Sequence, residues 1–379
     1  MVHTLPEEQR DLLGVIERFV REQVAPHADE HEANATFPIQ TYRELAALGG
    51  TGIAFPEDVG GSGLAYRTYL LALEELARGH ATLALAVSVN TLTAGAIDRF
   101  GSAELRQAAA RPLVEGGQLG AYSLSEPQAG SDAASLVCRA ERDGEVYRVT
   151  GTKAWVTHGG IADRYVLFAR TSDDGSRGIS AFVVEADTPG VHVAKAEDKM
   201  GLRGSPTTML AFDGAIVPAD QRLGDEGAGF RIAMAALDGG RLGIAAVATG
   251  VAQSALDHAL RYAREREQFD RPIIDFQGVS FLLADMATGI EAGRALYKDA
   301  ASRWDAGFDA GKVAAMSKLL CTDTAMRVTT DAVQVLGGVG YTRDFPVERL
   351  MREAKVMQIF EGTNQIQRVV IARRLAQGS

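Results

Sequence analysis

The hydrophobic pattern of this 379-residue chain changes twice along its length, and these changes limit the folds that it can adopt. Apolar residues recur at helical spacing up to about residue 120, between Gly- and Pro-rich breaks. Short β-rich runs with turn signals such as Asp143-Gly144 occupy residues 121–225, and long helical stripes return over residues 226–379. We therefore predict an α+β fold of three domains: an N-terminal helical domain (1–120), a middle antiparallel β-barrel domain (121–225) and a C-terminal antiparallel helical bundle (226–379).

Two apolar stripes define the predicted C-terminal bundle. Their members repeat at spacings of three and four residues, which places them on one face of a helix. The first stripe comprises Val279, Leu282, Leu283, Met286 and Ile290, and the second comprises Val313, Met316 and Leu320.

Composition excludes several classes of protein. A net charge of -10 and a pI near 5.3 argue against nucleic-acid binding and against attachment to an anionic membrane by charge alone. The first residues show neither a signal sequence nor a transit pattern, and apolar stretches such as residues 83–89 fall short of the roughly 20 residues that span a bilayer. We expect a cytoplasmic protein without membrane insertion, in which Cys138 and Cys321 are reduced core residues; a disulfide between them is the alternative.

Common nucleotide and metal motifs are missing from the sequence. No GxGxxG or GxxxxGK[ST] pattern occurs, and the glycine-rich segments at residues 60–63 and 337–340 read as turns. His27 and His31 have metal-ligand spacing but no third ligand nearby, so we predict no metal and favour a solvated helix face for the pair.

The segment Ile359-Phe360-Glu361-Gly362-Thr363-Asn364 places a carboxylate between an aromatic residue and a flexible glycine. A carboxylate at the mouth of an apolar groove can remove a proton bound to carbon, and a glycine lets a substrate approach the backbone. The alternative is that Glu361 is a solvated loop acid and that Thr363 or Asn364 caps the following helix.

Four further segments follow one another along the chain: Tyr122-Ser123-Leu124-Ser125-Glu126-Pro127-Gln128-Ala129-Gly130-Ser131-Asp132, Trp155-Val156-Thr157, Lys199-Met200-Gly201-Leu202-Arg203-Gly204-Ser205 and Gln334-Val335-Leu336-Gly337-Gly338-Val339-Gly340-Tyr341. Together with the segment at Glu361, they resemble the motifs of the acyl-CoA dehydrogenase family in order and spacing, over essentially the whole chain. Membership would imply the family's three-domain fold and an FAD cofactor.

The residues at Trp155 suit a flavin. Trp155 and Thr157 lie two apart on a predicted strand, so the indole and the hydroxyl face one side of the sheet; a core Trp beside a sheet Thr is the alternative. A capped turn is the alternative for residues 125–131, and a solvated charge is the alternative for Arg266. The resemblance implies these FAD contacts: Tyr122, Leu124, Ser125, Gly130, Ser131, Trp155, Val156, Thr157, Arg266, Phe269, Gln277, Gln334, Val335, Leu336, Gly337, Gly338, Thr363, Asn364 and Gln365.

The same resemblance implies a substrate site and a reaction. Asp238 and Arg241 lie one helical turn apart and match the family's contact with the thioester and pantetheine, to which Ser131 and Gly362 also contribute; an ordinary surface salt bridge is the alternative. Glu361 would remove the α-proton of an acyl-CoA while the β-hydrogen leaves as hydride to FAD, which gives a trans-2-enoyl-CoA. The thioester oxygen would be stabilised by the Glu361 backbone N–H and a flavin hydroxyl.

The family's assembly and partners are also implied. Its members are typically tetramers, dimers of dimers, in which residues matching Arg266 and Gln334 to Gly338 reach the FAD of a neighbouring subunit. An electron-transferring flavoprotein is the expected electron acceptor, and fatty acid β-oxidation is the expected process.

Three departures from the family pattern, His158, Phe360 and Asp270, leave the catalytic groups intact. The overall sequence most resembles the short-chain, butyryl branch of the family. We therefore expect short to medium acyl groups, straight or branched. Two alternatives remain: a flavin oxidase or dehydrogenase of a carrier-protein-bound or CoA-free substrate, and a non-catalytic flavin-binding protein on the same fold.

Overall fold

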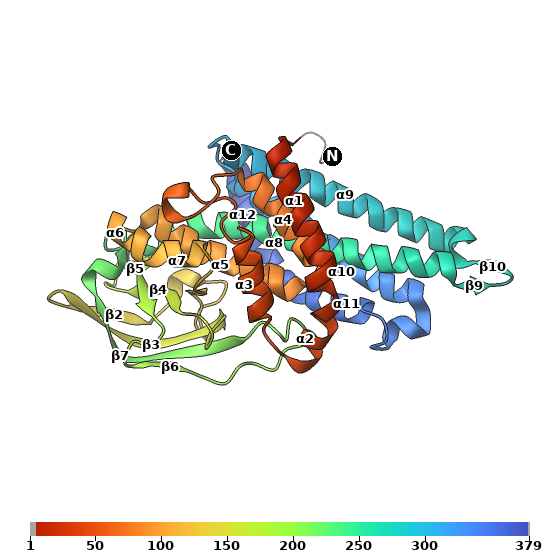
Figure 1. Ribbon diagram of the computed structural model, residues 1–379. Helices are drawn as coiled ribbons and strands as arrows, with labels where there is room; N and C mark the ends of the chain where they lie inside the picture. Colours follow the sequence, from red (N-terminus) through yellow and green to blue (C-terminus); the bar gives the residue numbers. More distant parts are fainter. Residues whose placement is uncertain (1–4, 378–379) are drawn as a thin grey trace.

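The computed structural model describes residues 5–377. The outer ends of the first and third predicted domains, residues 1–4 and 378–379, lie outside this part. Two helical regions pack around one long helix, α8 (Gly229–Glu265), and a β-sheet lies against one end of them (Figure 1). The order helices, sheet, helices confirms the predicted three-domain fold.

The N-terminal helices precede the first strand, which begins at Gly120. Among them, α5 is apolar on nearly every side and almost completely buried, as expected of a helix at the centre of a core. The helices are α1 (Glu7–Phe19), α2 (Ala28–Asn34), α3 (Ile39–Ala47), α4 (Tyr66–Gly79), α5 (Ala81–Phe100), α6 (Ala103–Leu105) and α7 (Arg111–Val114).

The middle domain is one sheet in which strands pair in the order β6-β7-β3-β2-β4-β5-β8, with β1 also paired to β4. The prediction of a purely antiparallel barrel is wrong in two respects. The β1–β4 and β2–β4 pairs are parallel, and within the described residues no pairing joins β6 to β8. Turn signals in the sequence report where strands end but not which strands pair. The strands are β1 (Gly120–Ser123), β2 (Arg139–Asp143), β3 (Val146–Thr157), β4 (Arg164–Arg170), β5 (Ile179–Glu185), β6 (Val191–Val193), β7 (Thr207–Pro218) and β8 (Arg222–Leu223).

The C-terminal helices surround α8, which contacts α4, α5, α9, α10 and α11. The end of α8 and the start of α9 project from the body and are joined by a small hairpin of β9 and β10, and α10 packs along α9 (Figure 1). The remaining elements are β9 (Glu267–Gln268), β10 (Arg271–Pro272), α9 (Gln277–Asp305), α10 (Gly311–Leu336), α11 (Val347–Met357) and α12 (Asn364–Ala376).

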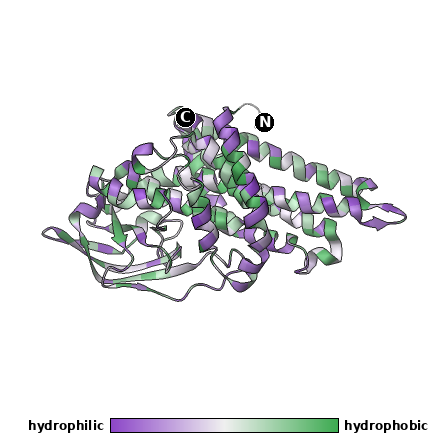
Figure 2. Cartoon of the chain, in the orientation of Figure 1, coloured by the Kyte–Doolittle hydropathy of each residue, from purple (hydrophilic) through white to green (hydrophobic). Residues whose placement is uncertain are grey.

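α5 and α8 are long and apolar enough to cross a membrane by length and composition. The expectation that all apolar stretches are too short is therefore wrong for these two helices. The most apolar windows of α5 and α8 are 83% and 72% buried inside the protein, which is typical of core helices. Figure 2 shows the apolar residues concentrated where the helices cross.

The core has one part between helices and one on each side of the sheet. Along β4, Val166 and Phe168 pack towards α5, whereas Tyr165 and Leu167 pack on the opposite side of the sheet. This alternation follows from the two-residue repeat of a strand, and burial on both sides explains the continuous apolar sequence of β4.

The second predicted apolar stripe on α10 is correct at Val313, which is buried, but wrong at Leu320. Leu320 is 37% exposed, whereas Lys318 and Cys321 are buried. A polar side chain therefore occupies the core face of α10 at a position that a hydrophobic pattern assigns to solvent.

Buried charges join the three domains. Glu32 of α2 accepts hydrogen bonds from Arg352 of α11 (Oε1 to Nη1, 2.8 Å) and from the backbone N–H of Arg203 in the β domain (2.7 Å). Arg352 also donates to the Met200 carbonyl oxygen at 2.8 Å. These bonds hold the Lys199–Ser205 motif between the two helical domains.

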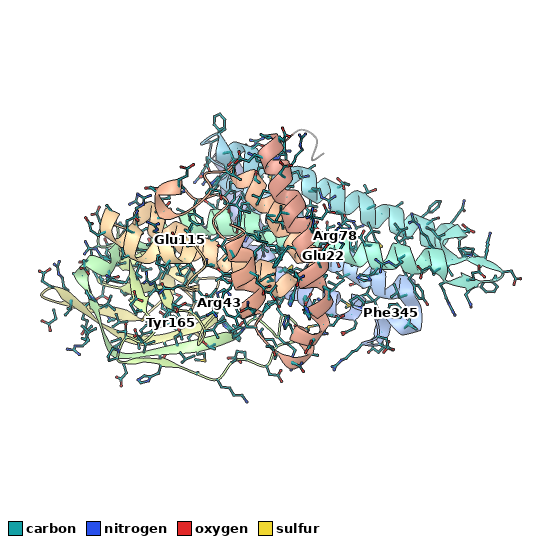
Figure 3. All side chains as sticks on the ribbon, viewed as in Figure 1. Glu22, Arg43, Arg78, Glu115, Tyr165 and Phe345 are labelled. Carbon is teal, nitrogen blue, oxygen red and sulfur yellow. The ribbon has the colours of Figure 1, made fainter. Side chains whose placement is uncertain are left out.

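A second contact ties the N-terminal domain to α8. Arg78 of α4, labelled in Figure 3, donates from Nε to Asp257 Oδ2 at 2.8 Å. This pair lies in partial contact with solvent, so it stabilises the interface less than the buried Glu32 contacts do.

Replacing Glu32 with Ala should lower the free energy of unfolding by about 2 kcal/mol, because it removes one acceptor of the partly buried Arg352 guanidinium and the acceptor of the Arg203 backbone N–H. Urea denaturation would measure this change. Glu30→Ala, on the same helix at an exposed position, is the matched control and should change stability little. Equal effects of the two substitutions would contradict the role of Glu32.

Candidate active site

Glu361 lies in the short loop between α11 and α12, in an unusual backbone conformation. Its φ is 51° and that of Gly362 is 87°, so two consecutive residues are left-handed. A non-glycine residue in this region is strained, and such strain persists where surrounding contacts hold it. Thr363 caps α12 by accepting from the Ile366 backbone N–H at 3.2 Å.

The Glu361 carboxylate packs directly against the backbone of α8. A Cβ built on Gly240 would overlap Glu361 Oε2, so only glycine at this position allows the approach. Glu361 Oε2 is buried and has no hydrogen-bond partner among the described residues. Burial raises the pKa of Glu361 to about 7, and the positive charges of Lys318 and Arg241 oppose that rise. The interpretation of Glu361 as a solvated loop acid is therefore wrong.

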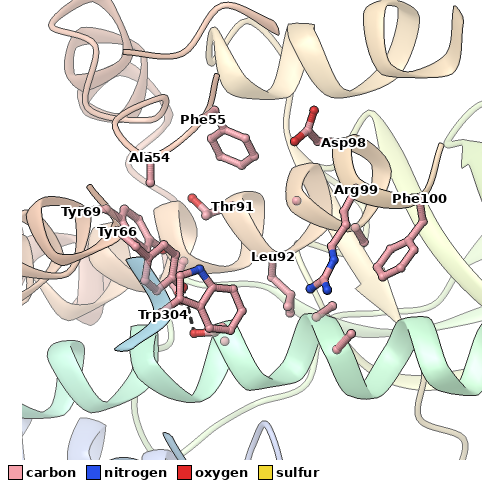
Figure 4. Close-up of a pocket in the computed structure, with 17 residues that line it drawn as sticks. Ala54, Phe55, Tyr66, Tyr69, Thr91, Leu92, Asp98, Arg99, Phe100 and Trp304 are labelled. Carbon is pink, nitrogen blue, oxygen red and sulfur yellow. Dashed lines mark hydrogen bonds between the residues drawn. The ribbon is translucent and has the colours of Figure 1, made fainter. Parts of the chain in front are cut away.

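A mainly apolar cavity of about 280 Å³ is lined in part by Gly240, the glycine that the Glu361 carboxylate packs against (Figure 4). It lies between α4, α5 and α8. Tyr66 donates to the Gly239 carbonyl oxygen (3.0 Å) and stacks on Trp304 with ring centroids 5.2 Å apart. The other lining residues are Ala54, Phe55, Tyr69, Ser88, Thr91, Leu92, Gly95, Ala96, Asp98, Arg99, Phe100, Ala235 and Ala236.

Asp238 and Arg241 pair with each other beside this cavity. Arg241 is only 5% exposed, so the pair is not the surface salt bridge that was the alternative. Burial raises the pKa of Asp238, and Arg241 opposes that effect. The pair lies on the part of α8 that also supplies Gly239 and Gly240, which places it beside the Glu361 carboxylate.

Trp155 presents a large exposed aromatic surface, with 64% of the residue accessible, and its φ is 60°. A bulge interrupts the pairing of β3 with β7 between Lys153 and Val156. Thr157 is partly exposed, whereas the Val156 side chain is buried in the core of the sheet. Only the backbone of Val156 is available to a ligand.

The segment at Tyr122 to Ser131 reaches the site through its first residues. Glu361 contributes to the raised pKa of Tyr122, whose main cause is burial, so the two side chains are electrostatic neighbours. Leu124 is 9% exposed, Ser125 is partly exposed, and Gly130 and Ser131 are exposed.

A buried ion pair anchors this segment. Lys153 Nζ lies 2.7 Å from Glu126 Oε1 and also donates to the Leu124 carbonyl oxygen at 3.0 Å. Glu126 accepts in addition from the backbone N–H groups of Val137 and Cys138. The position of Ser125 and its neighbours is therefore fixed from inside the sheet.

The remaining predicted cofactor residues lie far from Trp155. Arg266 and Phe269 belong to the hairpin at the outer end of α9, and Phe269 is 88% exposed (Figure 1). Phe269 and Asp270 both have positive φ, which a two-residue hairpin turn requires and which Asp tolerates better than most residues. Gln277, at the start of α9, is exposed.

The end of α10 returns to the same end of the protein as this hairpin, because α9 and α10 are antiparallel: Gly289 faces Arg327 and Gly293 faces Cys321. This return places residues 334–338 near the start of α9. Gln334, Gly337 and Gly338 are exposed, whereas the side chains of Val335 and Leu336 are buried. One chain thus holds two separate groups of predicted FAD contacts.

Asn364 does not fit its predicted contact with the cofactor. Its side chain is buried and donates to Thr322 Oγ1 and Asp323 Oδ1, and its oxygen accepts from Lys318. A residue whose amide is fully engaged inside the protein has no donor left for a ligand. Gln365, next to it, is exposed.

Sequence reasoning missed several residues at the site. Gly240, Tyr66, Trp304 and Lys318 were not identified. Gly240 could have been found, because it is next to Arg241, which the sequence did indicate. The other three lie on elements distant in sequence, and only the tertiary packing brings them to this site.

Comparison with known proteins is consistent with this geometry. Profiles of the acyl-CoA dehydrogenase N-terminal, middle and C-terminal domains match residues 6–117, 121–215 and 227–376. The chain belongs to the acyl-CoA dehydrogenase family. It is 46% identical over 375 residues to an acyl-CoA dehydrogenase of Bacillus subtilis, covering 98% of this chain and 99% of the other.

Solved structures of this family share the whole architecture. Butyryl-CoA dehydrogenase from Megasphaera elsdenii matches with a TM-score of 0.96 and 42% identity, over 98% of this chain and 99% of that chain. A chain in the structure of the electron transferring flavoprotein of Acidaminococcus fermentans matches with a TM-score of 0.97 and 44% identity, over 98% of both chains.

Replacing Glu361 with Gln should stabilise the fold at neutral and higher pH. The folded-state pKa of about 7 lies above the ordinary value of 4.5, so the folded protein binds this proton more tightly than the unfolded chain does. The stability from that proton is lost as pH rises from about 4.5 to about 7.

The variant should therefore exceed the parent by about 3 kcal/mol in unfolding free energy at pH 8 and by less than about 1 kcal/mol at pH 5. Urea titrations at the two pH values measure this difference. An advantage that does not change with pH would show that Glu361 does not carry a raised pKa.

Proposed function

We propose that this protein is an FAD-dependent acyl-CoA dehydrogenase that converts a short- to medium-chain acyl-CoA, straight or branched, to the trans-2-enoyl-CoA. The observation that carries this proposal is the Glu361 carboxylate, which is held against Gly240 at an apolar cavity with a raised pKa and a free oxygen. A base with a pKa near the working pH, next to a space for an acyl chain, suits removal of a proton from carbon.

The residues of the chain divide the reaction between them. Glu361 takes the α-proton as the α C–H bond breaks, and the electrons of that bond form the new double bond as the β-hydrogen leaves with its electron pair. FAD, when bound, supplies the two-electron acceptor for that hydride. The Glu361 backbone N–H is the protein's donor towards the thioester oxygen, on which negative charge gathers.

The chain suits a flavin at Trp155. Trp155 is 64% exposed and has a left-handed backbone conformation at a bulge. An exposed indole on a strained backbone does not stabilise the fold, so it indicates a binding surface. Thr157, two residues on, supplies a partly exposed hydroxyl, and Ser125 and Ser131 supply further hydroxyls in the segment that the Glu126–Lys153 pair fixes. A flat ring with hydrogen-bonding edges needs this combination of an apolar surface and donors.

The cavity limits the acyl group. Its walls combine the aromatic rings of Tyr66 and Trp304 with small residues such as Gly95 and Ala236. A volume of about 280 Å³ that ends at aromatic rings supports short to medium acyl groups. The similarity to the Megasphaera butyryl-CoA dehydrogenase supports the same substrate range.

The assembly, partner and location are further parts of the proposal. We propose a homotetramer, in which the exposed Phe269 and Gln334 of one subunit complete the FAD site of another, because these residues lie far from Trp155 within one chain. The similarity to the chain in the Acidaminococcus fermentans structure supports an electron-transferring flavoprotein as electron acceptor. We propose a cytoplasmic location and a role in fatty acid β-oxidation.

Anaerobic titration of the purified protein with saturated acyl-CoAs from C4 to C16, and with isobutyryl- and isovaleryl-CoA, tests the function. Bleaching of the flavin band by the shorter esters is the expected result. A flavin that no CoA ester reduces would overturn the proposal in favour of a carrier-protein substrate or a non-catalytic role.

Gly240→Ala should lower the rate of flavin reduction by roughly 100-fold or more, because the added methyl group displaces the Glu361 carboxylate. Gly239→Ala is the matched control: its Cβ would lie 3.2 Å from Tyr66 Oη, a contact that a small shift relieves. Stopped-flow absorbance measures both rates. Similar losses in the two variants would mean that the contact between Gly240 and Glu361 is not decisive.

Gly95→Leu should narrow the substrate range. Gly95 lines the cavity, and a Cβ at this position meets nothing within 4 Å, so the backbone there has room for a side chain. The rate with octanoyl-CoA relative to butyryl-CoA should fall roughly 10-fold or more. Gly14→Leu, at an exposed helical glycine with equal space, should leave this ratio unchanged; an unchanged ratio in Gly95→Leu would place the acyl chain elsewhere.

A further inference from the structure

Lys318 is a buried lysine on α10, behind the loop that carries Glu361. It is 0% exposed, and its Nζ donates to the Gly362 carbonyl oxygen (2.8 Å) and to Asn364 Oδ1 (2.9 Å). Both acceptors are neutral, so neither cancels the ammonium charge. A buried cation is costly unless a nearby anion balances it.

The loop that Lys318 holds is the strained one. Glu361 and Gly362 both have positive φ, and their carbonyl groups are fixed by side chains from outside the loop. The Gly362 carbonyl oxygen accepts from Lys318 and from Gln367 Nε2 (2.9 Å), and Gln367 lies 3.3 Å from the Glu361 carbonyl oxygen. These bonds set the direction in which the Glu361 side chain leaves the backbone.

The charges around Glu361 come from two helices. Lys318 of α10 is the larger of the two positive influences on its pKa, and Arg241 of α8 is the smaller. Burial lowers the pKa of Lys318 to about 8, Glu361 and Asp323 raise it, and Arg241 lowers it further. Arg241 is paired with Asp238, and the negative charge of that carboxylate offsets part of the effect of Arg241 on Glu361.

The other groups near Glu361 are neutral. Tyr66 and Tyr69 of α4 and Tyr122 of β1 have pKa values raised mainly by burial, with Glu361 adding to the rise. None of them therefore ionises near neutral pH. Of the two described cations that act on the Glu361 carboxylate, Arg241 is paired with Asp238, whereas Lys318 donates its hydrogen bonds to neutral oxygens.

We propose that Lys318 is a positioning residue for the reaction: it anchors the Glu361-Gly362 loop through the Gly362 carbonyl and, through its charge, keeps the Glu361 carboxylate ionised in its apolar surroundings. This inference rests on the proposed role of Glu361 as the base. Hydrogen bonds alone would serve a structural purpose, but a buried charge this close also acts on the carboxylate.

Lys318→Met tests both parts. Removal of the charge should raise the pH midpoint of flavin reduction by an acyl-CoA by roughly one unit, which corresponds to a roughly five-fold loss of rate at pH 7. Loss of the anchor should also lower the rate at the high-pH plateau. Stopped-flow reduction of the holoenzyme by butyryl-CoA from pH 6 to pH 9 gives both quantities, and Lys318→Arg should restore the midpoint.

Asn364→Asp supplies an independent variant in case Lys318→Met does not fold. It leaves the lysine in place and sets a carboxylate against its Nζ, in place of an amide oxygen at 2.9 Å. The midpoint should again move upward. Lys195→Met, at an exposed lysine of the β domain, is the control and should leave the profile unchanged.

The outcomes separate the two levels of the proposal. If butyryl-CoA and longer esters do not bleach the flavin of the parent protein, the proposed function itself is wrong. If they bleach the parent protein and either folded variant shows the parent's pH midpoint, only the role of Lys318 is wrong. A purely structural role would lower the plateau and leave the midpoint where it was.

Discussion

The contact on which the site depends is the burial of one carboxylate against the backbone of a helix. Glu361 Oε2 lies where a side chain on Gly240 would be, and it has no hydrogen-bond partner among the described residues. Desolvation raises the pKa of the carboxyl to about 7, and Lys318 and Arg241 limit the rise. The same burial that makes Glu361 costly to fold makes it a stronger base than an exposed carboxylate.

The fold provides this contact by joining elements that are distant in sequence. The loop between α11 and α12 supplies the carboxylate, α8 supplies the glycine, and α10 supplies the buried cation behind it. Glu32 and Arg352 connect the helical domains and the β domain, so that the sheet carrying Trp155 is held against the helices that form the cavity. Burial of these charges lowers the stability of the fold, but their contacts fix the geometry of the site.

Much of this was predictable from the sequence because local patterns report local structure. Periodicity separates helices from strands, and motif order identifies Glu361, Trp155 and Arg241. The parallel pairing of β1 with β4 was not predictable, because turn signals do not encode strand order. Lys318 was missed because hydrophobic patterns assign a lysine to solvent, and the engagement of Asn364 was missed because its partners lie on α10, more than forty residues away.

The most direct measurement is an anaerobic visible spectrum of the parent protein and of the Glu361→Gln variant, each mixed with butyryl-CoA. If Glu361 is the base, the flavin band of the parent bleaches, whereas the variant keeps its bound flavin oxidised. Rapid bleaching in the variant would contradict the assignment, because the proton would then leave without this carboxylate.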